Sequence, residues 1–170
     1  MRTAALLLLA TLLGACAPVD DSENPDIPAT LDEEARVCRT TPERATRLAL
    51  EAASRGLLYT SESDYPYDYV SLPAAPVART LTSAQFLAAL GRPADTAIEV
   101  RTLDRVFSHL VNPEVTGADA PRFAALERTI RQRLTYVQVF AVGTIQVHLY
   151  IVGRDRCGTL VGLHTVSIET

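Results

Sequence analysis

The sequence contains no lysine and no tryptophan, and only three of its 170 residues are cysteine. It also lacks the short motifs of common catalytic sites: there is no Gly-x-Ser-x-Gly elbow, no His-Glu-x-x-His pair and no phosphate-binding loop. Neither Ser61 nor Ser63 has a basic residue beside it that would activate the hydroxyl. We therefore expect that the protein is not an enzyme and that it needs no cofactor.

A strong charge of one sign is missing from most of the chain. The formal net charge is −4, but seven of the 20 acidic residues lie within residues 17–34. From residue 35 onward, 15 arginines stand against 13 acidic residues, a net charge of +2. This part lacks the clustered basic residues of a nucleic-acid-binding protein, and it is not acidic enough to imitate a DNA backbone by its overall charge. We expect no direct binding of nucleic acid.

Residues 1–15 have the pattern of a signal peptide. Arg2 precedes an apolar run from Ala4 to Leu13 that is too short to span a bilayer. The ending Leu13-Gly14-Ala15-Cys16 resembles a bacterial lipobox, which implies cleavage before Cys16 and lipidation of that residue. The alternative is an ordinary secretory signal followed by an incidental cysteine. Ala17 implies delivery to the outer membrane in an organism that has two membranes, so the expected location is the cell envelope, with a lipid anchor.

Residues 16–40 form an acidic segment with prolines at positions 18, 25 and 28. Such a composition buries too little apolar surface to become ordered, so we expect a flexible tether between the lipid anchor and a folded domain. If Cys16 is lipidated, Cys38 and Cys157 remain, and an even pair in an oxidising compartment favours a disulfide. Two free thiols stay possible, because the sequence does not show whether the two residues approach each other.

Residues 41–170 have the length of one domain. Hydrophobic periodicity and capping residues predict helices that begin near residues 42, 83, 103 and 121 and end near residues 55, 90, 110 and 134. Residues 112–121 are predicted to be a loop. Alternating or β-branched runs predict strands over 67–72, 98–101, 137–142, 145–152 and 159–168. The last three strands form an antiparallel meander, which gives an α+β domain whose sheet is covered on both sides.

The segment Ser61-Glu62-Ser63-Asp64-Tyr65-Pro66-Tyr67 is an acidic and aromatic loop between apolar anchors, a rigid arrangement that suits recognition. It resembles the signature of the nuclease A inhibitor family, as do residues 104–107, 149–153, 158–163 and the ending Glu169-Thr170. The resemblance covers about residues 43–170. It implies a three-layer α-β-α sandwich, and a protein that binds and blocks a sugar-nonspecific, divalent-metal-dependent nuclease. We expect a monomer.

The family resemblance also implies which residues bind the partner: Ser61, Glu62, Tyr65, Glu169 and Thr170. In the family, the C-terminal threonine enters the nuclease active site, where its oxygens reach the catalytic metal. Thr170 would therefore contact a metal only in the partner. Glu62 would pair with a basic group of the nuclease.

Two alternatives apply to the same loop. Glu62 and Asp64 could instead cap amides of the loop, an interpretation that we favour for Asp64. Tyr67 could belong to the interface, although a tyrosine at this position more often packs in the core.

One departure from the family concerns residues 112–121. A member of the family presents a tryptophan to its nuclease from this loop, whereas this chain has Val115-Thr116-Gly117 there. The expected function is a membrane-anchored nuclease inhibitor. The alternative is a non-catalytic envelope lipoprotein that keeps the fold but binds a different protein.

His148 and His164 lie on two adjacent predicted strands. If Gly153 pairs with Thr159, the two imidazoles are directly opposite each other on one face. Two such rings could begin a metal site, but the sequence places no third ligand nearby. A partly exposed polar pair is the interpretation that we favour.

Overall fold

The computed structural model describes residues 38, 44–73 and 75–170. The predicted signal peptide, the predicted lipidation site Cys16 and nearly all of the predicted tether lie outside this range. Within it, no helix has both the length and the apolar character needed to cross a membrane.

The helices are set by local capping signals. Thr82 forms a capping box with Gln85 at the start of its helix, and the Thr102 hydroxyl accepts a hydrogen bond from the amide of Arg105. The α-helices of the described domain are α2 (Arg44–Ser54), α3 (Ser83–Ala89), α4 (Leu103–Leu110), α5 (Pro113–Thr116) and α6 (Ala120–Arg133), with a 3-10 turn at Gly117–Asp119.

The prediction of a loop over residues 112–121 is wrong. Asn112 accepts a hydrogen bond from the amide of Glu114 and so caps a short helix, and Pro113 occupies the first turn, where its missing N–H costs nothing. The helix α5 and the following 3-10 turn then lead directly into α6.

All strand pairs are antiparallel. Five strands form the main sheet in the order β3-β7-β6-β5-β4: β3 (Asp68–Ser71), β4 (Ile98–Arg101), β5 (Thr135–Val142), β6 (Gln146–Arg154) and β7 (Leu160–Ile168). Two short strands, β1 (Leu58–Tyr59) and β2 (Tyr65–Pro66), pair with each other on either side of the acidic loop. The predicted α+β fold with a C-terminal meander is confirmed, whereas the small β1–β2 pair was not predicted.

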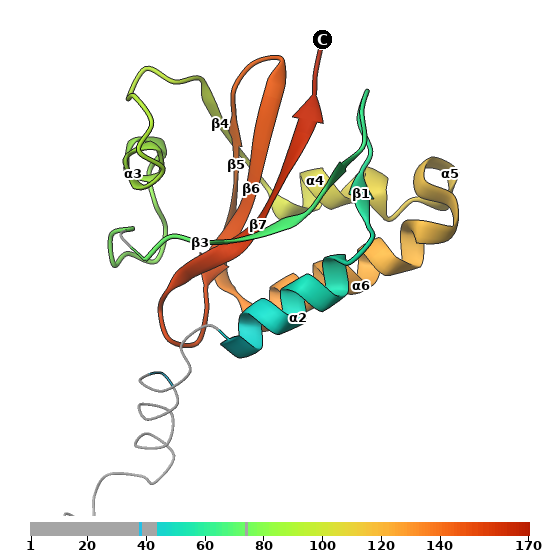
Figure 1. Cartoon of the computed structure of the whole chain (residues 1–170), viewed down its shortest axis with the longest axis horizontal. Coiled ribbons are helices and arrows are strands. Elements are labelled where there is room, and N and C mark those ends of the chain that lie inside the picture. The colour runs from blue at the N-terminus through green and yellow to red at the C-terminus, as the bar shows by residue number, and fades with distance from the viewer. Residues whose placement is uncertain (1–37, 39–43, 74) are drawn as a thin grey trace, which may run out of the picture.

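Helices cover both faces of the main sheet (Figure 1). On one face, α2, α4 and α6 pack against alternate residues of the central strands, with Phe107 and Ile130 against Val139. On the other face, Phe86 of α3 stacks on Phe140, with ring centroids 4.0 Å apart. Because neighbouring residues of a strand point to opposite faces, Val139 and Phe140 belong to different cores. The result is the predicted three-layer arrangement.

The turn between β6 and β7, residues 155–159, sets a register that differs from the predicted one. Gly153 pairs with Val161 rather than with Thr159, and His164 lies opposite Tyr150 rather than His148. The reason is the Asp155 side chain: its Oδ1 accepts hydrogen bonds from the amides of Cys157 and Thr159, which shapes a turn one residue further along the chain.

The two histidines still meet, but diagonally across the strands. Their rings stack with centroids 5.2 Å apart, and His148 Nδ1 lies 3.0 Å from His164 Nε2. The structure has no group of three or more His, Cys, Asp or Glu residues able to hold a metal ion within residues 38, 44–73 and 75–170. The pair is a polar contact on the face that carries α3.

Cys38 and Cys157 are joined by a disulfide, with their Cα atoms 5.5 Å apart. The bond ties the chain before α2 to the turn between β6 and β7. It closes a loop of 119 residues, and a cross-link of this span restricts the unfolded chain strongly.

Loss of this disulfide should destabilise the domain. We expect the double variant Cys38→Ser/Cys157→Ser to lose about 2–5 kcal/mol of unfolding free energy in urea denaturation. A reductant should lower the urea concentration at the unfolding midpoint of the wild type to about that of the variant. The same treatment should leave the midpoint of the variant unchanged. Rapid labelling of both thiols in the untreated native protein would show that the bond is absent.

The histidine pair predicts a pH dependence of stability. Burial lowers the pKa of both rings, and Arg92 beside His148 lowers the pKa of that ring further, whereas Asp68 opposes the shift at His164. The unfolded chain therefore binds more protons as the pH falls below about 6.5, and the unfolding free energy should fall in that window.

The variant His148→Gln/His164→Gln should weaken this pH dependence, measured by urea denaturation between about pH 5 and pH 8. His109, whose pKa is also lowered by burial, stays in place and accounts for part of the remaining slope. If the unfolding free energy of the double variant depends on pH as steeply as that of the wild type, the two histidines do not cause the dependence.

Candidate functional site

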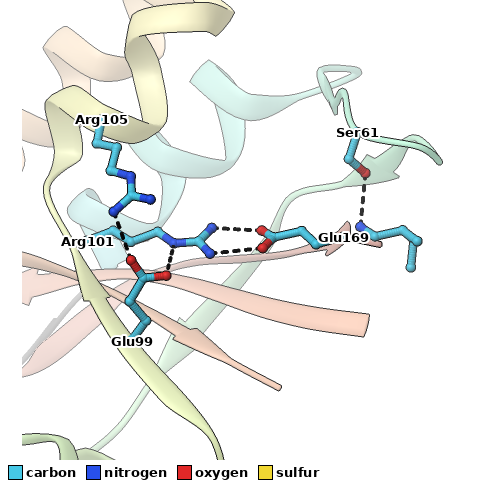
Figure 2. A network of polar contacts seen from close by, with 6 residues as sticks. Ser61, Glu99, Arg101, Arg105 and Glu169 are labelled. Atoms are coloured by element: carbon cyan, nitrogen blue, oxygen red, sulfur yellow. Dashed lines mark hydrogen bonds and ion pairs between the residues drawn. The ribbon is translucent and has the colours of Figure 1, made fainter. Parts of the chain in front are cut away.

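The acidic loop between β1 and β2 is attached to the end of the last strand. Ser61 Oγ accepts a hydrogen bond from the backbone amide of Ile168 at 3.1 Å (Figure 2). The same hydroxyl donates to the carbonyl of Ser63 at 2.8 Å. Ser61, predicted as a contact residue, therefore also fixes the position of the loop.

Two of the predicted contact residues touch each other. The Thr170 hydroxyl donates a hydrogen bond to Glu62 Oε1 at 2.5 Å, although the two residues are 108 positions apart in the sequence. Both side chains are exposed. We call this exposed pair, together with Asp64 of the same loop, the Glu62–Thr170 surface.

Glu169 is held by an arginine of β4, the edge strand that β5 and β6 separate from β7. Arg101 donates two hydrogen bonds to the Glu169 carboxylate, at 2.8 and 3.0 Å, and a third to Glu99 at 2.8 Å. Arg105, one turn into α4, donates to the other oxygen of Glu99 (Figure 2). The paired, planar geometry of the Arg101–Glu169 contact fixes the direction in which the chain leaves β7.

The ion pairs keep these groups charged at neutral pH. Hydrogen bonding to Arg101 lowers the pKa of Glu169 and of Glu99, and the same contacts raise the pKa of Arg101. The Arg101 side chain is only 14% exposed, so solvent screens this contact less than a surface ion pair. Glu169 thus acts as a brace for Thr170, and the resemblance alone did not predict this role.

The tyrosines of the loop divide between surface and core. Tyr65 is half-buried, and its carbonyl accepts a hydrogen bond from the Thr165 hydroxyl at 3.3 Å. Tyr67 is buried, and its ring meets Tyr59 edge to face with centroids 6.5 Å apart. Burial raises the pKa of Tyr67, which therefore stays a neutral core residue, whereas Tyr65 remains at the rim of the exposed surface.

Four residues of this region were not predicted as part of the site: Tyr59, Glu99, Arg101 and Arg105. A partial signal exists, because Glu99 and Arg101 are two positions apart on a strand and so share a face. Nothing in the sequence pairs Arg101 with Glu169, however, because the two are 68 positions apart, and β4 and β7 are separated in the sheet by β5 and β6.

The site presents oxygen atoms and negative charge. The exposed groups are the Glu62 and Asp64 carboxylates and the Thr170 hydroxyl. Such hard oxygen donors suit a divalent cation or an arginine or lysine of another molecule. An arrangement of oxygen acceptors held in place by the fold suits binding.

The family model for nuclease A inhibitor-like protein matches residues 45–170. The chain belongs to this family. The match includes all strands of the described domain and the whole acidic loop, so the predicted resemblance is confirmed. No curated protein matches the chain.

Membership in the nuclease A inhibitor-like family favours a non-catalytic protein whose partner is another protein, a nuclease. In this member, the two segments that the family resemblance singled out meet at the Glu62–Thr170 surface.

The role of Arg101 can be measured directly. In the variant Arg101→Gln the pKa of Glu169 should rise toward its ordinary value, because the charged hydrogen-bond donors are lost. An NMR titration of the side-chain carboxyl carbons would follow this change. We also expect the unfolding free energy at pH 7 to fall by about 0.5–1 kcal/mol.

Arg122→Gln is the matched control, since Arg122 binds Asp119 and the carbonyl of Arg55 rather than Glu169. It should leave the Glu169 titration unchanged. Equal titration curves for Glu169 in the wild type and in Arg101→Gln would show that the brace does not operate in solution.

Proposed function

We propose that this protein is a membrane-anchored inhibitor of a sugar-nonspecific, divalent-metal-dependent nuclease. The observation that carries the proposal is the hydrogen bond between the Thr170 hydroxyl and the Glu62 carboxylate. It makes one exposed surface from the two segments that the family resemblance assigns to the nuclease.

The chemistry of this surface complements a nuclease active site. Such a site holds a divalent metal with open positions and basic groups that bind DNA phosphates. Oxygens of Thr170 can serve as hard ligands to that metal, and the Glu62 carboxylate can pair with a phosphate-binding arginine or lysine. Because the rest of the domain is nearly neutral, inhibition depends on these local contacts and not on a long-range field.

The surface is already ordered by the fold, which favours tight binding. Ser61 fixes the loop to β7, and Arg101 fixes Glu169 next to Thr170. Side chains held in their bound geometry lose little conformational entropy on association. Tyr65, half-buried at the edge of the loop, adds an aromatic contact at the rim.

An alternative is a non-catalytic envelope lipoprotein that binds a different protein through the same surface. The absence of tryptophan favours it, since a member of the family presents that side chain from the segment that here forms α5. Val115 is 48% exposed on α5 and offers a smaller apolar contact. Lower affinity for the same nuclease, or a changed partner, follows from this difference.

The membrane anchor is a separate part of the proposal. It is supported by the apolar run before Leu13-Gly14-Ala15-Cys16 and by the acidic segment that follows. Mass spectrometry of the protein extracted from membranes tests it: a lipidated Cys16 at the N-terminus is expected, and an unmodified cysteine would contradict the anchor.

Inhibition is tested by DNA digestion with metal-dependent nonspecific nucleases in the presence of increasing amounts of the protein. We expect inhibition by the wild type, and a loss of about 10–100-fold in the variant Glu62→Gln, because a charged hydrogen bond is removed. Extension of the chain by three glycines after Thr170 should abolish inhibition, since the added residues occupy the space of the nuclease metal.

Asp95→Asn is the matched control, as it removes one exposed negative charge from the link between α3 and β4, outside the Glu62–Thr170 surface. It should change inhibition by no more than about threefold. Inhibition that survives the glycine extension would refute the role of Thr170. No inhibition of any nuclease tested would favour the alternative partner.

A further inference from the structure

Exposed arginines and apolar side chains gather at the end of the sheet that carries the disulfide. We call this group the basic end surface, and its residues are Val77, Arg79, Tyr136 and Arg156. Val77 is 99% exposed and Tyr136 is 49% exposed. They come from the link between β3 and α3, the junction of α6 with β5, and the turn between β6 and β7.

A buried arginine holds this surface together. Arg154, only 8% exposed, donates hydrogen bonds to the carbonyls of Ala78 at 3.0 Å, of Gly158 at 3.1 Å and of Pro76. These contacts fasten the link after β3 to the turn between β6 and β7. Val77 is therefore fully exposed on a segment that is fixed in place.

Tyr136 and Arg79 form the next part of the surface. Tyr136 has a positive φ of 53°, an unfavourable conformation for a residue with a bulky side chain. Its ring lies under the Arg79 guanidinium, 5.5 Å from the ring centroid. A hollow of about 330 Å³ opens beside them, lined also by Val77 and Arg156.

The charge that this end presents is positive. Of the charged residues that line the hollow, Arg79 and Arg156 are exposed, whereas Arg154 and Asp155 are buried. Asp155 is only 4% exposed, and its Oδ1 is engaged by the amides of the turn, so its charge does not reach the surface. The acidic residues Glu62 and Asp64 lie at the opposite end of β7, about 30 Å away for a strand of nine residues.

We propose that the basic end surface docks on anionic phospholipid headgroups. Arginines bind phosphate oxygens through paired donors, and tyrosines and small apolar side chains favour the boundary between water and hydrocarbon. The disulfide joins Cys38 to this same end, so only residues 17–37 separate it from the proposed anchor at Cys16.

Docking in this way orients the protein. Because β7 runs from the disulfide turn to the C-terminus, the Glu62–Thr170 surface points away from the membrane (Figure 1). This inference rests on the proposed lipid anchor, but it does not depend on nuclease inhibition.

The absence of tryptophan provides the test. Val77→Trp places a single tryptophan on the basic end surface, and Val115→Trp places one on α5 as the matched control. The lipidated full chain of each is reconstituted in vesicles of phosphatidylcholine and phosphatidylglycerol that carry a quencher in the headgroup region. We expect strong quenching and a blue-shifted emission for Val77→Trp, and neither for Val115→Trp.

Charge is tested in the same Val77→Trp chain. Arg79→Gln and Arg156→Gln should each lower the ratio of docked to undocked protein about fivefold. Vesicles of phosphatidylcholine alone, or a salt concentration of about 0.5 M, should release the basic end surface from the membrane. Arg55→Gln/Arg128→Gln removes two exposed arginines elsewhere and should have little effect.

Equal quenching of the two tryptophans, or binding unaffected by Arg79→Gln/Arg156→Gln, would overturn the inference, as would a chain that carries no lipid. Failure of the nuclease assay leaves these readings unchanged, so the two proposals can fail separately.

Discussion

The pairing of β7 with β6 on one side and β3 on the other is the constraint on which the rest of the structure depends. This strand begins after the disulfide turn and ends two residues before Thr170. Its register therefore fixes the positions of both the disulfide turn and the C-terminal residues. It also carries the amide of Ile168 that holds Ser61. A shift of one residue would move Leu163 to the opposite face of the sheet and disrupt the packing of both cores, so the register stays fixed.

The candidate site is built on this strand from a few polar contacts. Ser61 attaches the loop, and Arg101 holds Glu169 in place, which leaves Glu62 and Thr170 exposed. Recognition by so small a group depends more on side chains that are already fixed in position than on the buried interface area. Each fixed side chain avoids a loss of conformational entropy on binding. Membership in the nuclease A inhibitor-like family is consistent with this use of the fold.

Much of the fold could be predicted from sequence because its signals are local. Thr82, Thr102 and the apolar spacing of Phe123 and Ile130 identify helices within a few residues of their true ends. The predicted pairing of β6 with β7 was wrong by two residues, because the Asp155 side chain shapes the turn between the two strands. Turn geometry of this kind depends on side-chain hydrogen bonds that composition does not reveal.

The sequence by itself determined four of the helices, the five strands of the main sheet, the two-sided sheet, the family, and Glu62 and Thr170 as candidate contact residues. The elements follow from periodicity and capping, the family from short motifs, and the two contact residues from the resemblance to that family. Only the tertiary structure decided that Glu62 touches Thr170, that Arg101 holds Glu169, and that Arg79, Tyr136 and Arg156 share one end. These contacts join residues that are far apart in the chain, so no short segment of the sequence could reveal them.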